Sequence, residues 1–175
     1  VWALDLAAEL ASLLERSEEV RALRTRRDAA QIAMEQVFGT DYGYGSWLAS
    51  SGALHRHKGH CMILPAAFGL SPKERTESVL GTVQSDAMWL EPHGPLRGDR
   101  QSGVRGGEWV WAFMRWNLVS ALFRAGHADR GAELAADWAR SELAAGLPAS
   151  ESFPTPITGI TGNGYVWTAG RAIRS

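Results

Sequence analysis

Helix connections of two contrasting lengths alternate along this 175-residue chain, and they constrain its fold more than any other feature. Connections in helical bundles usually take about 2 to 8 residues, but three loops here run to about 15 to 20. These loops span residues 40–58, 86–107 and 148–164. In the first, aromatic residues and glycines alternate, so it is a plain loop or a short β-hairpin. Tight turns alternate with them, at residues 24–27, 69–72 and 126–128. The alternation predicts helical hairpins that stand in a ring, with every long loop at the same end.

Between these connections, apolar residues recur with the 3.6-residue period of an α-helix. Helices are predicted at residues 2–23, 27–38, 60–70, 71–85, 108–125 and 127–145, with another starting near residue 165. One face of the first helix consists of leucines, namely Leu6, Leu10, Leu13 and Leu14. In the helix at residues 108–125, the predicted core stripe consists of Leu118, Ala121, Leu122 and Ala125. No segment has a convincing strand pattern, so the predicted fold class is all-α.

Several of these helices have start and stop signals. Ser71 and Glu74 predict an N-cap and a capping box, with Pro72 in the first turn of the same helix. Gly39 and Gly126 follow periodic segments and predict helix ends. The chain begins within an amphipathic helix and stops as another begins, so we expect a single all-α domain that is part of a longer polypeptide.

Composition and charge argue against several kinds of partner. The formal net charge of −1 gives no electrostatic reason to expect nucleic acid or an anionic membrane. No apolar run approaches the roughly 20 residues needed to span a bilayer. The single cysteine, Cys61, excludes an internal disulfide and favours a reducing compartment such as the cytoplasm. Eight tryptophans indicate a heavy core or surfaces that stack on flat ligands, sugar rings among them.

The best candidate for a catalytic group is Glu151, in the loop PASESFPTPITGITGNGYVWTAG. It is the only charged residue of that stretch, and a catalytic carboxylate needs a fixed and partly dry position. Three prolines restrict the backbone around it, and Phe153, Tyr165 and Trp167 can shield it from water. A solvated loop glutamate is the alternative that composition alone leaves open.

A second candidate cluster lies in the segment VRGGEWVWAFMRW, which contributes Arg105, Glu108, Trp109 and Trp111. Glycines before a helix allow a ligand to approach its backbone N–H groups. We expect Trp109 and Trp111 to lie in the first turns of a helix, where residues two apart cannot both face the core. One of them should therefore point toward the loop end of the ring. Two other loops contribute candidate groups for binding hydroxyls, Asp99 and Trp47.

Metal and cofactor chemistry are poorly supported. The segment HRHKGHC supplies His55, His57, His60 and Cys61, but their spacing matches no closed zinc site. The sequence has neither a phosphate-binding glycine loop nor a G-x-S-x-G nucleophile motif, so no cofactor is expected.

Three segments resemble the six-hairpin glycosidases, whose catalytic domains are (α/α)6 toroids. RGGEWVWAF resembles their RGG-x-VWPW segment, and ALFRAGHADRGAELAADW is similar to the hairpin that follows it. ESFPTPITGITGNGYVWTAG resembles the loop near the end of their catalytic domains. The nearest branches are those of glucosidase I, glycogen-debranching enzymes and mannosylglycerate hydrolases. The resemblance implies that this chain forms about half of such a toroid, the C-terminal half.

The resemblance also implies an activity, inverting hydrolysis of an α-glycosidic bond in an oligosaccharide or small glycoside. Glu151 corresponds to the general base of the inverting members, which hold their two carboxyl groups about 6.5 to 9.5 Å apart. Arg105, Trp111 and Trp167 match positions that line the sugar pocket. The general acid would lie outside this chain, in the N-terminal half of the same polypeptide, which is the expected partner besides a carbohydrate substrate.

Two other functions remain open from the residues. A non-catalytic scaffold of tetratricopeptide type would give superposable hairpins, although such repeats keep a period near 34 residues that is not found here. A sugar epimerase or lyase on the same toroid would bring His93, His127 and Tyr165 together as acid and base.

Overall fold

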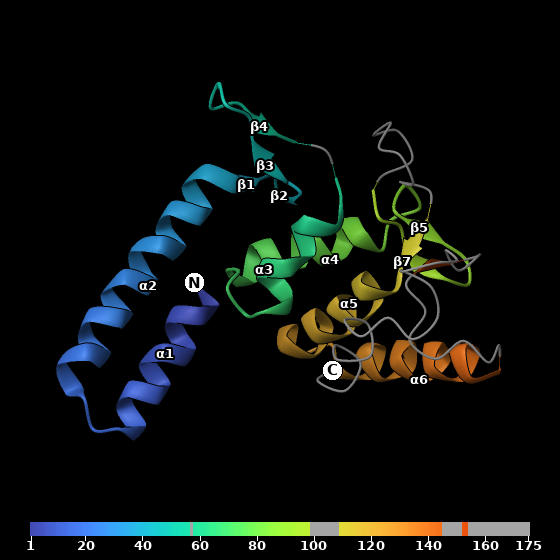
Figure 1. The fold of residues 1–175 in the computed structure, drawn as a ribbon. Coiled ribbons are helices and arrows are strands. Elements are labelled where there is room, and N and C mark those ends of the chain that lie inside the picture. The colour runs from blue at the N-terminus through green and yellow to red at the C-terminus, as the bar shows by residue number, and fades with distance from the viewer. Residues whose placement is uncertain (57, 99–108, 145–151, 154–175) are drawn as a thin grey trace, which may run out of the picture. The chain divides into compact units, whose positions relative to one another are not determined.

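The structure of the chain is a computed structural model that describes residues 1–56, 58–98, 109–144 and 152–153. The chain divides into two compact units, Val1–Gly39 and Thr40–Ser175 (Figure 1).

The first unit is a helical hairpin of α1 (Trp2–Leu13) and α2 (Ser17–Phe38). The turn lies at residues 14–16, where Glu15 has a φ of 58°. The predicted turn at residues 24–27 is wrong, because α2 runs through it. The first part of α2, SEEVRALRTRRDAA, contains neither Gly nor Pro, so nothing in it interrupts the helix. Glu18 and Glu19 in the first turn also stabilise the helix, because they complement its dipole.

Small residues, rather than the leucines, form the buried side of α1. Ala8 and Ala11 are buried, and Arg27 of α2 pairs with Asp5 of α1 at 2.9 Å. The leucine face is exposed, with exposed fractions from 45% for Leu6 to 82% for Leu13. The periodic leucines therefore form an exposed apolar stripe.

The second unit is built around α5 (Ala112–Ala125). The other helical segments of this unit are η1 (His60–Ile63), α3 (Leu64–Ala67), α4 (Lys73–Val83) and α6 (Ala128–Ala144). Figure 1 shows α5 between α3 and α4 on one side and α6 on the other, and all three helices contact it. The predicted core stripe is confirmed for Leu118, Ala121 and Leu122, which are buried, whereas Ala125 at the end of the helix is only half-buried.

The α5–α6 turn is the predicted one. Gly126 caps α5 at a φ of 89°, a left-handed conformation that glycine adopts without steric cost. In contrast, the predicted capping box of α4 does not form. Pro72 is the N-cap, and the Ser71 hydroxyl instead accepts a hydrogen bond of 2.8 Å from Tyr44.

The structure also contains strands of two residues each. A short β-hairpin was an expected alternative only for residues 40–58, and the strands elsewhere were not predicted. They are β1 (Gly39–Thr40), β2 (Gly43–Tyr44), β3 (Trp47–Leu48), β4 (Leu54–His55), β5 (Trp89–Leu90), β6 (Gly94–Pro95), β7 (Val110–Trp111) and β8 (Ser152–Phe153). Such strands are too short to show an alternating pattern. They pair consecutively as β1–β2, β3–β4, β5–β6 and β7–β8.

No helix in the described part of the chain is long and apolar enough to cross a membrane.

The leucine stripe of α1 generates a testable prediction. We expect the 175-residue chain to bind a hydrophobic dye or to self-associate, because contiguous exposed apolar patches favour association. A Leu6→Lys, Leu10→Lys double variant should reduce dye fluorescence and shift the sedimentation profile toward the monomer.

Leu143→Lys is the matched control, since Leu143 is a similarly exposed leucine on α6 of the second unit. A wild-type chain that is monomeric and does not bind the dye would contradict the prediction.

Candidate functional site

Short backbone pairings bring distant segments together at the start of α5. Gly59 bridges to Gly98, and Leu96 bridges to Val110. The Arg97 N–H donates to the Trp109 carbonyl at 2.8 Å, and the Arg97 carbonyl accepts from the His60 N–H at 3.0 Å. Residues 59–60, which follow the first predicted long loop (40–58), therefore meet residues 96–98, which lie within the second (86–107). Residues 109–110, just after the second loop, pair with the same stretch.

Strand β7 extends this assembly to the last described segment. β7 pairs antiparallel with β8, with Val110 opposite Phe153 and Trp111 opposite Ser152. Ser152 is the residue directly after Glu151 in the sequence.

Four side chains form what we call the Trp111 cluster: Trp111, His60, Arg97 and Phe113. The guanidinium carbon of Arg97 lies 5.5 Å from the centre of the Trp111 ring, a cation–π contact. His60 contacts the same ring in a T-shaped arrangement with centroids 5.1 Å apart, and Phe113 lies at 5.4 Å. The cluster is thus an indole surrounded by a guanidinium, an imidazole and a second aromatic ring.

Two groups of the cluster have N–H donors without a hydrogen-bond or ion-pair partner among the described residues. The Trp111 indole nitrogen is buried and finds no hydrogen-bond partner among residues 1–56, 58–98, 109–144 and 152–153. Arg97 is half-buried and forms no ion pair with a carboxylate of the described chain. A half-buried aromatic surface with nearby N–H donors can stack on a sugar ring and donate to its hydroxyl oxygens.

The predicted helical placement of Trp109 and Trp111 is wrong. α5 begins only at Ala112, and Val110–Trp111 are extended, so Val110 is buried between two less buried tryptophans. Trp109 is 39% exposed, and Trp111 is half-buried. Trp111 does lie at the loop end of α5, where one of the two was expected.

Trp47 makes its ring contact outside the Trp111 cluster. It is 48% exposed on β3, and its ring stacks on His55 of β4 at 4.3 Å (hairpin β3–β4, Figure 1). It shares no ring contact or hydrogen bond with Trp111 in the part of the chain that the structure describes. Six predicted site residues lie outside the described residues: Asp99, Arg105, Glu108, Glu151, Tyr165 and Trp167.

The histidines named for the epimerase or lyase alternative have separate surroundings. His127 pairs with Glu77 of α4 at 3.0 Å on an exposed surface. His93 lies in the turn between β5 and β6, where burial and the Arg115 charge lower the pKa of its imidazole below 6.5. Tyr165 lies outside the described residues. The described residues contain no group of three potential metal ligands. His57 lies outside the described residues.

Sequence reasoning missed a second cluster, centred on Trp138 of α6. Arg115 is 1% exposed, and its guanidinium pairs with Glu142, 9% exposed, at 3.0 Å. The Arg115 guanidinium carbon also lies 4.6 Å from the centre of the Trp138 ring. Burial lowers the pKa of Arg115 to about 10, and the Glu142 carboxylate opposes this shift. The sequence signal was available, because Arg115 lies three residues before Leu118, on the predicted core stripe.

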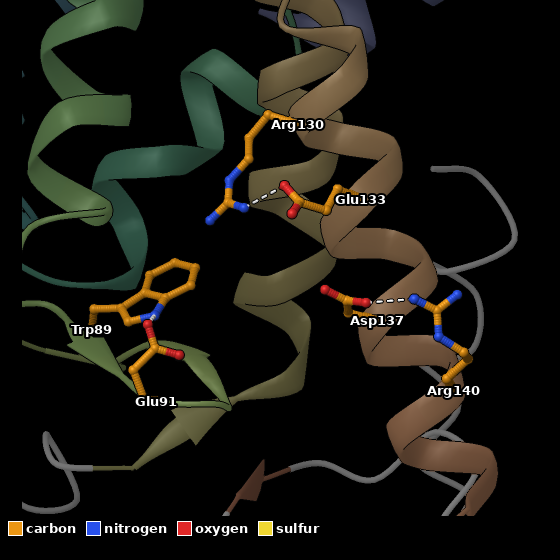
Figure 2. Close-up of polar contacts among 6 residues, drawn as sticks. All are labelled: Trp89, Glu91, Arg130, Glu133, Asp137 and Arg140. Carbon is orange, nitrogen blue, oxygen red and sulfur yellow. Dashed lines mark hydrogen bonds and ion pairs between the residues drawn. The ribbon is translucent and has the colours of Figure 1, made fainter.

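Two more tryptophans surround Trp138. Trp89 lies 6.2 Å from it, and Trp116 meets it edge-on at 6.5 Å. The Trp89 indole N–H donates to Glu91 at 2.8 Å (Figure 2). Figure 2 also shows two exposed ion pairs on α6, Arg130–Glu133 and Asp137–Arg140.

This arrangement of helical hairpins, with structured connections gathered at one end of α5, has the fold of about half of an (α/α)6 toroid. Solved structures of this class match the chain. A GH63 mannosylglycerate hydrolase from Thermus thermophilus, in complex with glucose, is 21% identical with a TM-score of 0.69. The match covers 99% of this chain and 45% of that one.

An uncharacterized conserved protein from the same organism, Thermus thermophilus, is 24% identical with a TM-score of 0.70, over 98% of this chain and 43% of that one. The mannosylglycerate hydrolase in complex with Tris and D-glycerate is 23% identical with a TM-score of 0.57, over 94% and 41%. The chain thus spans less than half the length of these proteins. No family model and no curated protein matches it. The similarity confirms the predicted fold and agrees with the resemblance to the six-hairpin glycosidases.

The buried Arg115–Glu142 pair predicts a large mutational effect. Arg115→Met should cost about 3–5 kcal/mol of unfolding free energy, because it leaves the Glu142 carboxylate buried without its counter-ion. Urea unfolding measures the loss. Adding Glu142→Leu to Arg115→Met should recover much of it, since an apolar pair carries no desolvation cost.

The exposed Arg130–Glu133 pair supplies the control, because Arg130→Met should change stability by only about 0–1 kcal/mol. Equal losses for Arg115→Met and Arg130→Met would contradict the account of the buried pair.

His93 should make the stability of the chain depend on pH. Its folded-state pKa lies below the ordinary value of 6.5, so the unfolded chain binds its proton more readily. The stability that neutral His93 contributes is present above pH 6.5 and is lost as pH falls through the folded pKa. We expect His93→Gln to flatten the decline in urea midpoint below pH 6.5, while His55→Gln at an exposed position should not. An unchanged decline in His93→Gln would refute this assignment.

Proposed function

We propose that this chain is part of a glycoside hydrolase and that the Trp111 cluster is a wall of its sugar site. The observation that carries the proposal is the pairing of Trp111 with Ser152, the residue that follows Glu151. It joins the segment that follows the candidate base to a half-buried indole that can contact a sugar.

In this proposal Glu151 is the general base of an inverting hydrolysis. Its carboxylate takes a proton from a water molecule, which attacks the anomeric carbon on the face opposite the leaving group. A general acid outside this chain protonates the departing oxygen. The oxygen of water forms the new bond, and the configuration at the anomeric carbon is inverted.

The described side chains have roles that fit this reaction. Trp111 offers an indole edge with a buried N–H that can donate to a sugar hydroxyl. Arg97 and His60 supply further donors around the same ring. Arg105 and Trp167, with Glu108, Trp109, Tyr165, Asp99 and Trp47, are proposed as further sugar-binding residues on the strength of the sequence alone.

The solved neighbours support a small carbohydrate as the ligand class. The mannosylglycerate hydrolase of Thermus thermophilus has been crystallised with glucose and with Tris and D-glycerate. A small α-glycoside or oligosaccharide is therefore the proposed substrate. The remaining polypeptide of a full toroid is the proposed source of the general acid.

The two alternative functions have less support. A repeat scaffold does not explain the convergence of loops at Trp111, and the toroid structures match over nearly the whole chain. An epimerase or lyase would need His93 and His127 in one place, but His127 pairs with Glu77, whereas Arg115 acts on His93.

The test is the variant Glu151→Gln in the polypeptide expressed from the whole gene, assayed on aryl α-glycosides and disaccharides. We expect the hydrolysis rate to fall by about 10²–10⁴-fold, the usual contribution of a general base. Proton NMR of the first product should show the inverted anomer with the wild-type protein. Glu133→Gln, an exposed glutamate of α6, is the matched control and should keep full activity.

Unchanged hydrolysis in Glu151→Gln would remove the role of this residue, and a product of retained configuration would exclude the inverting mechanism. Trp111→Ala should mainly raise the Michaelis constant, because stacking binds the sugar before and during the reaction.

A further inference from the structure

Trp138 lies against the backbone of hairpin β5–β6. The indole is 2% exposed, and a Cβ atom at position 94 would lie only 2.7 Å from its Cζ2 atom. Gly94 also has a φ of 107°, which side-chain-bearing residues rarely adopt. The hairpin therefore approaches α6 as closely as a polypeptide backbone can.

The Arg115–Glu142 pair fixes the indole in this place. Arg115 of α5 stacks on the Trp138 ring, and Glu142 lies one helical turn after Trp138 on the same face of α6. The 3.0 Å ion pair between them closes the arrangement. Movement of the indole would separate a buried cation from its aromatic partner or from its counter-ion, both of which are costly in the interior.

The same hairpin leads directly into the Trp111 cluster. Residues 94 and 97 are only three apart, and the backbone that follows Gly94 is held by hydrogen bonds. The Leu96 N–H donates to Met88 at 2.7 Å, and the Arg97 N–H donates to Trp109 at 2.8 Å. Displacement of the hairpin at Gly94 is therefore passed to Arg97, whose guanidinium contacts the Trp111 ring.

We infer that Trp138, fixed by Arg115 and Glu142, is a positioning residue that sets Arg97 against the Trp111 ring. It acts through hairpin β5–β6 and does not itself contact the ligand. Its effect on sugar binding rests on the proposed function, whereas its effect on the position of Arg97 does not.

The experiment compares Gly94→Ala, Trp138→Leu and Trp138→Phe in the 175-residue chain, with amide hydrogen exchange as the local measurement. Gly94→Ala and Trp138→Leu should speed exchange of the Arg97 and His60 amides by about tenfold, a usual size for coupling between contacting residues. Trp138→Phe keeps a ring in contact with the hairpin and should restore most of the protection.

Leu134→Ala is the matched control. Leu134 is a buried residue one turn before Trp138 on α6, so its truncation lowers global stability without touching Gly94. It should leave the exchange of Arg97 and His60 unchanged relative to other amides of the core. If Leu134→Ala speeds these two amides as much as Trp138→Leu does, the role of Trp138 is general stability and the inference fails.

Binding of glucose, measured by isothermal titration in the same variants, separates this inference from the proposed function. Altered exchange with weaker binding supports both. Altered exchange with no sugar binding in any variant or in the wild type keeps the positioning role and counts against the sugar site. Unaltered exchange in folded Gly94→Ala overturns the inference, and this mild change decides the matter should Trp138→Leu fail to fold.

Discussion

The burial of α5 is the constraint on which the rest of the second unit depends. Ten of its residues are buried, and α3, α4 and α6 all contact it. A helix packed on several sides cannot rotate or slide without opening voids that lose contacts. Trp111 directly precedes this helix, and Arg115 lies in its first turn. The Trp111 cluster and the Trp138 cluster are therefore both positioned by the same rigid helix.

The helical part of this arrangement could be predicted because its signals are local. The apolar stripe containing Leu118 and Leu122, followed by Gly126, predicts the end of a buried helix and the turn after it. The turn of the first unit was misplaced because no glycine or proline marks it. There a left-handed Glu15 makes the turn, and this requirement has no distinctive sequence pattern.

The candidate site was less predictable because its geometry depends on pairings between distant residues. Val110 and Trp111 favour strands, but a strand of two residues is too short for its period to be distinguished from that of a helix. Arg97 and His60 meet Trp111 through the bridge between Gly59 and Gly98, and neither residue carries a sequence signal of its own. Trp111 was chosen as a candidate because its segment resembles a known motif, and that resemblance says nothing about what packs around it.

The Arg115–Glu142 pair raises the question of why a charge is kept inside this core. Buried ion pairs seldom stabilise a fold beyond what apolar residues of the same size would achieve. In some proteins such pairs also specify one packing, and here a shift of α6 along α5 by a turn would separate Arg115 from Glu142. An apolar pair would tolerate such a shift, and Trp138 would then leave Gly94. We therefore expect the pair to favour a single register between the two helices, and the position of hairpin β5–β6 depends on that register.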